Sequence, residues 1–208
     1  MSNFLGIAEK TFLVTGFANR KSVAWHVAES LEKEGANIIY AVRSQKRHTE
    51  LLALKPSAEV VVCDFEKEQD ISSLRSYLES VESNSIHGVL HSIAFANYSE
   101  GLKPFHETNV KDYLQATQIS SFSLVELANA CKPALQKDAS IVTIGISSIN
   151  VTAENYGYMA PIKASLEANV RYLAKSFSSF SSVRFNSVNA GPLNTSASAG
   201  IPGYLKNY

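Results

Sequence analysis

A tyrosine and a lysine seven positions apart, Tyr156 and Lys163, are the pair in this sequence best suited to catalysis. Because an α-helix has about 3.6 residues per turn, this separation would place both side chains on nearly the same face of one helix. A neighbouring ammonium group favours the phenolate form of a tyrosine and makes its hydroxyl a better hydrogen-bond donor. The pair could therefore stabilise negative charge that develops on a carbonyl oxygen as a hydride arrives. The alternative is a half-buried tyrosine near a solvated lysine, without a shared role.

The elements that must position this pair follow from an alternation of short apolar runs with amphipathic stretches. We expect strands at residues 11–15, 37–42, 58–63, 88–92, 140–144 and 183–188, and helices at 22–34, 71–81, 110–135 and 156–177. Strands that alternate with helices predict an α/β fold, a doubly wound parallel sheet with right-handed crossovers. The chain has no repeats or low-complexity linkers, so we expect a single domain over residues 1–208.

Composition excludes several classes of function. The 208 residues are 45% hydrophobic, and 19 basic residues balance 19 acidic ones, so no overall field draws the chain to nucleic acid or to a membrane surface. Cys63 and Cys131 stand in apolar contexts without the spacing of metal ligands, which favours a reduced cytoplasmic protein without a metal site. The first residues lack the pattern of a signal peptide, and no run approaches the roughly 18 apolar residues of a membrane span.

Ligands of such a sheet bind beyond the carboxyl ends of its strands, so the loops there are the candidate binding site. After the first strand only Gly16 remains of a glycine-rich dinucleotide motif, although Ala18 and Ala24 are small enough to let a pyrophosphate approach. Ser22 is a favourable N-cap for the following helix, whose dipole would face that anion. The alternative is that Ser22 only caps a helix.

The loops after the second and third strands contain candidate contacts for an adenosine. Arg43, Lys46 and Arg47 follow the second strand without an acidic residue, which favours a cofactor with a 2′-phosphate, NADPH, over NADH. The alternatives are a solvated basic loop, or an Arg43 that stacks on the adenine and accepts both cofactors. Asp64 and Phe65 could bracket the adenine, although Asp64 could equally be the N-terminal signal of the next element.

Five segments resemble one known family and occur in its order along nearly the whole chain. They are Gly16-x5-Ser22-Val23-Ala24, residues 91–96 (HSIAFA), 119–124 (ISSFSL), 163–172 (KASLEANVRY) and 189–195 (NAGPLNT). The chain is similar to the NAD(P)H-dependent enoyl-[acyl-carrier-protein] reductases of the short-chain dehydrogenase/reductase superfamily, which have a Rossmann-type fold. The Tyr-x6-Lys spacing distinguishes this family from ordinary short-chain dehydrogenases, which have Tyr-x3-Lys.

The resemblance implies a role for each matching residue. Tyr156 would donate a hydrogen bond to the thioester carbonyl as the enolate forms, and Lys163 would bind the hydroxyls of the nicotinamide ribose. The other implied cofactor-binding residues are Gly16, Ser22, Val23, Arg43, Asp64, Phe65, Ser92, Ile93, Ala94, Leu193, Asn194, Thr195, Ser196 and Ala197. The implied substrate contacts besides Tyr156 are Ala96, and Phe95, Ile201 and Tyr204, which could equally be loop anchors.

The resemblance also implies a homotetramer that acts on acyl-carrier-protein thioesters in the cytoplasm with NADPH or with NADH. One departure is Ile146, which stands where the family has a second tyrosine ten residues before the catalytic one. Ser147, Ser148 and Tyr158 are nearby, but Tyr158 would face elsewhere because two residues turn a helix by roughly 200°. Ile146 keeps open a non-catalytic nucleotide-binding or sensing protein, and the same Tyr156 and Lys163 would also suit a carbonyl reductase.

Two further features depart from the family pattern. Members continue with another helix and a last sheet strand, so we expect that the 208 residues are a fragment or the ordered part of a longer protein. Without that strand, an edge and an apolar face would be exposed. Pro161 lies inside the expected helix, where it should bend or interrupt it.

Overall fold

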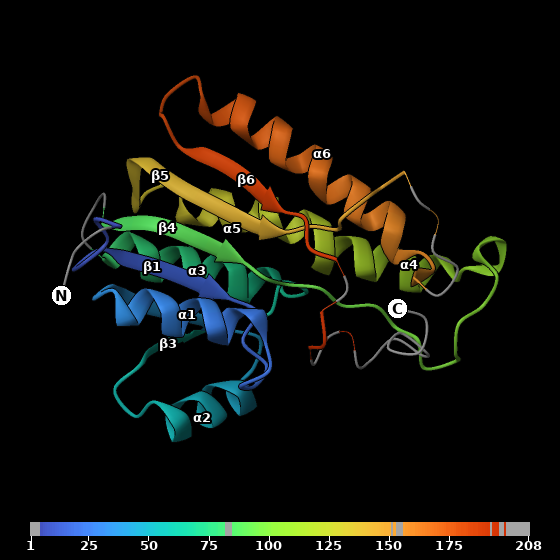
Figure 1. Ribbon diagram of the computed structural model, residues 1–208, viewed down its shortest axis with the longest axis horizontal. Coiled ribbons are helices and arrows are strands. Elements are labelled where there is room, and N and C mark those ends of the chain that lie inside the picture. The colour runs from blue at the N-terminus through green and yellow to red at the C-terminus, as the bar shows by residue number, and fades with distance from the viewer. Residues whose placement is uncertain are drawn as a thin grey trace.

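Six parallel strands form one sheet in the part of the chain that the computed structural model describes (Figure 1). The structure describes residues 5–81, 85–150, 152, 156–191, 193–195 and 198. The strands are β1 (Thr11–Thr15), β2 (Asn37–Val42), β3 (Glu59–Val62), β4 (Ile86–His91), β5 (Leu135–Ile144) and β6 (Arg184–Val188). Their order in the sheet is β3-β2-β1-β4-β5-β6, so the order reverses between β1 and β4. The predicted doubly wound α/β fold is confirmed, with a topological switch point at β1 and β4.

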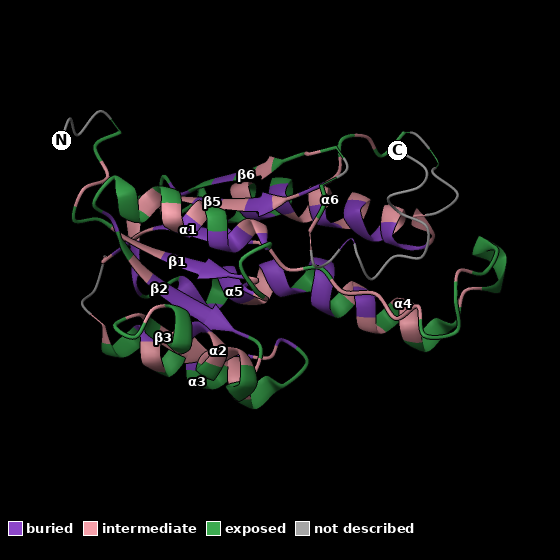
Figure 2. Cartoon of the chain, turned by 60° about the horizontal axis from the view of Figure 1, so that its bottom comes forward, coloured by how far each residue is buried: buried purple, intermediate pink, exposed green. Residues whose placement is uncertain are grey.

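Helices cover both faces of the sheet. They are α1 (Val23–Lys33), α2 (Gln45–Leu54), α3 (Glu68–Ser80), α4 (Val110–Thr117), α5 (Ser123–Cys131) and α6 (Met159–Phe177), with a 3₁₀ turn η1 (Phe105–Glu107) and a π-helical segment η2 (Gln118–Phe122). Because successive strand residues point to opposite faces, neighbouring positions join different cores. Leu13 packs in the core that contains Leu74 of α3 and Leu166 of α6, whereas Val14 packs in the core that contains Trp25 of α1. Figure 2 shows the resulting pattern of buried strands and exposed outer helix faces.

Three of the expected elements are corrected by the structure. The expected helix over residues 110–135 consists of α4, η2 and α5, and β5 begins at Leu135 instead of residue 140. The basic stretch after β2, expected to be a loop, opens helix α2, where the Ser44 side chain accepts a hydrogen bond from the backbone N–H of Arg47. Ser44 is thus the N-cap of a helix that hydrophobic periodicity did not indicate.

The start of α6 also differs from the expectation. Tyr156 does not lie on one helix with Lys163, because α6 begins at Met159 and Gly157 takes a left-handed φ of +53°. Pro161 is the third residue of α6, which continues to Phe177 without interruption. In the first turn a backbone N–H has no partner within the helix, so proline costs nothing there.

None of the helices that the structure describes combines the length and the apolar character needed to cross a membrane.

Candidate active site

A cavity of about 570 Å³ lies at the carboxyl ends of the central strands, where the sheet order reverses. Fifteen of the residues proposed from the sequence line it: Gly16, Ser22, Val23, Arg43, Asp64, Phe65, Ser92, Ile93, Ala94, Phe95, Ala96, Tyr156, Lys163, Leu193 and Thr195. Asn194 is exposed and does not belong to the wall. Ser196, Ala197, Ile201 and Tyr204 lie outside the described residues. The structure therefore gathers loops from both halves of the sheet around one space.

The turn after β1 requires a glycine. Gly16 has φ +90°, and a Cβ added there would lie 1.9 Å from the carbonyl oxygen of Ser92. The Thr15 hydroxyl fixes this approach, because it donates to the Leu90 carbonyl at 2.9 Å and accepts from the Ser92 N–H at 3.3 Å. The ends of β1 and β4 are thus held close together. A side chain on any other residue at position 16 would force them apart.

The turn leads into the N-terminus of α1, which meets the cavity at Ser22 and Val23. Ser22 occupies the N-cap position, but its hydroxyl donates to the Asn19 carbonyl at 2.6 Å and makes no side-chain cap. The prediction that the Ser22 side chain caps α1 is therefore wrong. Its hydroxyl instead makes a hydrogen bond within the loop that precedes α1. The first N–H groups of a helix have no partner within it and carry the positive end of the helix dipole, so this wall suits an anion.

Two arginines extend the wall beyond β2. Arg43 is exposed at the cavity, whereas Arg47 donates from Nη1 to the Ala18 carbonyl at 2.7 Å and to the Glu50 carboxylate at 2.6 Å. Lys46 is exposed and does not line the cavity. Of the three predicted cations, Arg43 and Arg47 therefore reach the site, and Arg47 also fixes the loop that follows Gly16.

Asp64 and Phe65 form the wall after β3. An Asp64 carboxylate oxygen accepts from the Glu66 N–H at 3.2 Å, and the Asp64 N–H donates to Asp70 at 3.0 Å. Phe65 is buried, and its carbonyl accepts from the Gln118 side chain at 3.1 Å. Asp64 therefore organises the turn before α3 and also faces the cavity, so the two alternatives from the sequence are compatible.

Lys163 is a buried cation of the site. Its side chain lies in the wall, it is 4% exposed, and Nζ donates to the Ile144 carbonyl at the end of β5 at 2.6 Å. Burial disfavours the charged form and lowers the pKa of Lys163 to about 8. An ammonium group has three donors, so two remain after the bond to Ile144.

A fully buried histidine lies beneath the site, at the end of β4. His91 Nε2 is 2.8 Å from the Ser123 hydroxyl, and Nδ1 is 2.8 Å from the Thr143 hydroxyl. Because Ser123 donates to the Ile119 carbonyl at 2.6 Å, its oxygen accepts from His91, which assigns the proton to Nε2. Burial and, secondarily, the charge of Lys163 lower the pKa of His91 to about 3. His91 therefore remains neutral and ties β4, β5 and α5 together.

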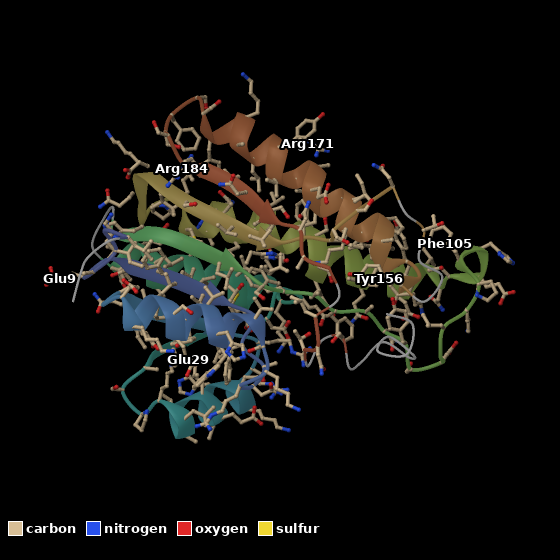
Figure 3. All side chains as sticks on the ribbon, viewed as in Figure 1. Glu9, Glu29, Phe105, Tyr156, Arg171 and Arg184 are labelled. Carbon is tan, nitrogen blue, oxygen red and sulfur yellow. The ribbon has the colours of Figure 1, made fainter. Side chains whose placement is uncertain are left out.

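Tyr156 lies just before α6 and lines the cavity (Figure 3). Met159 and Tyr98 pack in one cluster with Tyr156 and also line the cavity, and Ile146 is a further residue of the wall. Tyr158 is buried outside the wall, where its hydroxyl donates to the Asn97 carbonyl at 2.8 Å. The three candidates for the hydroxyl that Ile146 lacks thus separate: Ser147 and Ser148 line the cavity, whereas Tyr158 does not.

The sequence did not indicate two polar residues of the wall, Tyr98 and Ser198. Ser198 donates to the Thr195 carbonyl at 3.0 Å, and its hydroxyl accepts from the Thr195 N–H at 2.9 Å, so it closes the turn that carries Thr195. A serine three residues after a threonine is a weak local signal for such a turn. Tyr98 follows the segment 91–96 by two residues, and nothing in the local pattern indicates where its ring points.

Comparison with known proteins gives concordant matches. The sequence model described as enoyl-(acyl carrier protein) reductase matches residues 16–208. Enoyl-[acyl-carrier-protein] reductase [NADPH] FabI of Staphylococcus aureus strain MRSA252 is 33% identical over 205 residues, which are 96% of this chain and 79% of that protein. Enoyl-[acyl-carrier-protein] reductase [NADH] FabI of Bacillus cereus is 33% identical over 197 residues, 92% of this chain and 76% of that protein.

Solved structures agree with these sequence matches. The crystal structure of enoyl-[acyl-carrier-protein] reductase (NADH) from Aquifex aeolicus superposes with a TM-score of 0.88 at 30% identity, covering 96% of this chain and 79% of that chain. The Bacillus cereus enoyl-acyl carrier protein reductase in complex with NADP+ and indole naphthyridinone gives a TM-score of 0.87 at 31% identity, with the same coverage of 96% and 79%.

Proposed function

Because this chain belongs to the enoyl-(acyl carrier protein) reductase family, we propose that its cavity holds a reduced nicotinamide dinucleotide beside an acyl-carrier-protein thioester. The reaction is the reduction of the trans-2-enoyl double bond in fatty-acid elongation. One observation carries the assignment of the site: the Gly16 turn, the start of α1, Lys163 and Tyr156 meet around one cavity at the switch point of the sheet.

The residues of the wall fit a dinucleotide. Gly16 leaves room where a Cβ would collide with Ser92, and the N-terminus of α1 offers backbone N–H groups to a pyrophosphate. Arg43 and Asp64 give one end of the cavity donors and acceptors for an adenosine, with Phe65 as an apolar surface. At the other end, Lys163 has donors for the ribose hydroxyls next to the nicotinamide.

When bound, the dinucleotide supplies the hydride that adds to the β-carbon of the enoyl thioester. Electrons of the double bond then move onto the thioester oxygen, where the Tyr156 hydroxyl donates a hydrogen bond and stabilises the enolate. A proton added to the α-carbon completes the saturated thioester. Lys163 holds the ribose hydroxyls with the donors that its bond to Ile144 leaves, and its positive charge favours negative charge at Tyr156.

The relatives use NADPH or NADH according to their names, and we propose that this chain favours NADPH. Arg43 is exposed at the cavity and supplies a fork of donors for a 2′-phosphate, with Arg47 nearby in the wall. One charge-assisted bond corresponds to roughly 1.5–3 kcal/mol, and solvent screening places the preference near the lower end, about tenfold.

Steady-state kinetics with purified substrates tests both parts of the proposal. We expect reduction of crotonyl-acyl carrier protein but not of acetoacetyl-acyl carrier protein, with kcat/KM higher for NADPH than for NADH. Arg43→Gln should shift the cofactor ratio toward NADH, whereas the exposed Arg171→Gln on α6 should leave it unchanged (Figure 3). Reduction of the ketone alone would identify a carbonyl reductase, and turnover of neither substrate with intact cofactor binding would identify a sensing protein.

We further propose that residues 1–208 fold as one domain that forms a homotetramer in the cytoplasm. Support comes from exposed apolar side chains on the outer surface of α4, η2 and α6, namely Val110, Leu114, Phe122 and Tyr172, which are 67%, 61%, 51% and 79% exposed. These elements contact one another, so the side chains lie on adjoining helices on one face of the sheet. A second copy of this chain would cover them.

A further inference from the structure

The loop after β4 and the turn before α6 are joined by two hydrogen bonds in opposite directions. The Tyr98 hydroxyl of the loop donates to the backbone carbonyl of Tyr156 at 3.1 Å. The Tyr158 hydroxyl of the turn donates to the backbone carbonyl of Asn97 at 2.8 Å. Because a carbonyl can only accept, the direction of both bonds is fixed. The backbone of Tyr156, the residue proposed to stabilise the enolate, is thus bonded to the loop after β4.

Ring packing stabilises the same pair of segments. The rings of Tyr98 and Tyr158 lie with centroids 5.3 Å apart at an interplanar angle of 40°, and the ring of Tyr113 on α4 packs on Tyr158 at 6.2 Å. Burial, followed by the neighbouring phenols Tyr158 and Tyr156, raises the pKa of Tyr98, which therefore keeps its proton and remains a donor. Both halves of this link, which we call the tyrosine latch (Tyr98 and Tyr158), are well-defined interactions in an apolar setting.

Both sides of the latch are themselves anchored. On the loop, the Asn97 side chain donates to Asp112 of α4 at 3.0 Å, and the Ser120 hydroxyl of η2 accepts from the Phe95 N–H at 2.8 Å. On the turn, Gly157 adopts its left-handed φ, so that the residues before and after it, Tyr156 and Tyr158, both reach the loop. The loop is therefore a fixed support against which Tyr98 sets the position of Tyr156.

Tyr98 also lines the cavity, as does Ile146, whose apolar side chain offers no hydrogen bond. Resting on the function proposed above, we propose that Tyr98 is a positioning residue: its hydroxyl fixes the backbone of Tyr156 and so aims the Tyr156 hydroxyl at the thioester oxygen. Tyr98 acts through Tyr156 and does not itself touch the reacting atoms. Misplacement of a reacting group by about 1 Å can lower a rate by about a hundredfold, so a bond of this kind is large enough to matter.

A double-mutant cycle between Tyr98→Phe and Tyr156→Phe tests the inference, since Phe keeps the ring and removes only the hydroxyl. We expect Tyr98→Phe to lower kcat for crotonyl-acyl carrier protein about tenfold, with an unchanged dissociation constant for NADPH and an unchanged melting temperature. In the Tyr156→Phe background the same substitution should cause no further loss, because the hydroxyl that it positions is gone. Tyr158→Phe, which breaks the other half of the latch, should lower kcat in the same direction.

Tyr77→Phe is the matched control, because Tyr77 lies on α3 and does not line the cavity. The substitution removes a hydroxyl that bonds Glu59 of β3 and should leave kcat unchanged. An unchanged kcat in Tyr98→Phe overturns the inference. An equal loss of kcat in the Tyr156→Phe background also overturns the inference, since Tyr98 would then act on the substrate directly. A Tyr98→Phe variant that loses its fold or its binding of NADPH overturns it as well. A parent enzyme that does not reduce the enoyl thioester, or that is insensitive to Tyr156→Phe, overturns the proposed function together with this inference.

Discussion

The charged group of Lys163 is buried and has lost most of its hydration. The residue is 4% exposed, its Nζ donates to the Ile144 carbonyl, and burial lowers its pKa to about 8. Below that pKa the side chain is an ammonium with donors for ribose hydroxyls, and above it the neutral amine loses both its charge and one of its protons. If Lys163 binds the cofactor as proposed, this binding should depend on pH within an accessible range.

We expect the affinity of the parent enzyme for NADPH to be constant below about pH 8 and to fall above it, by up to about tenfold per pH unit for one proton. Fluorescence titration of NADPH between about pH 6.5 and about pH 9.5 measures this dependence. Lys163→Arg should remove it, because a guanidinium stays protonated, whereas Lys175→Arg on the exposed face of α6 should keep it. An affinity that stays constant up to the highest pH in the parent would refute the role of Lys163.

For single residues, the sequence correctly predicted a place in the cavity wall when the residue closely follows a strand. Gly16, Arg43, Asp64 and Ser92 all lie within two residues of a strand end, and all line the cavity. Tyr98 lies farther along its loop, and its position depends on contacts with Tyr156 and Tyr158, which are about 60 residues away. No local pattern contains that information.

The turn from β1 into α1 is the element most sensitive to an added side chain. We expect Gly16→Ala to abolish NADPH binding and to lower the free energy of unfolding by more than about 2 kcal/mol, because its Cβ would collide with the Ser92 backbone and φ is +90°. Gly101→Ala is the matched control: Gly101 has φ +82° with no atom within 4 Å of an added Cβ. Gly101→Ala should lower the free energy of unfolding only by the cost of backbone strain, roughly 1 kcal/mol.

Thermal unfolding and NADPH titration of the two variants measure this difference. Equal effects of Gly16→Ala and Gly101→Ala would show that the close approach of β1 to β4 is unimportant. The comparison is informative because the two glycines share a left-handed φ and differ in what surrounds them.

Hydrophobic alternation predicted the strands and the doubly wound sheet, but not how the long helix is divided. The π-helical segment η2 holds Ser120 against Phe95 and Ser121 against Ser165 and Asn169, through bonds that span 25, 44 and 48 residues. A π-helical turn satisfies tertiary partners of this kind at the cost of regular geometry. Helix α2 was missed for a different reason, because among its residues only Leu51 is buried and its apolar stripe is weak.

At the scale of the whole molecule, we propose that a second copy of this chain covers the exposed apolar side chains on α4, η2 and α6. We expect the parent to be a tetramer in light scattering coupled to size-exclusion chromatography, and Leu114→Glu combined with Tyr172→Glu to produce smaller species. Phe105→Glu is the control, because Phe105 is similarly exposed, at 58%, but lies on the separate turn η1 (Figure 3). A parent that is monomeric at all concentrations would contradict the proposed assembly.

The central claim is that the chain reduces an enoyl thioester with Tyr156 as the donor to the thioester oxygen. Single-turnover stopped-flow measurement of NADPH oxidation by crotonyl-acyl carrier protein tests it most directly, because it isolates hydride transfer from product release. Tyr156→Phe should slow this step by about a hundredfold or more while leaving NADPH affinity nearly intact, since only stabilisation of the transition state is lost. Tyr77→Phe should match the parent. A Tyr156→Phe variant as fast as the parent would contradict the account.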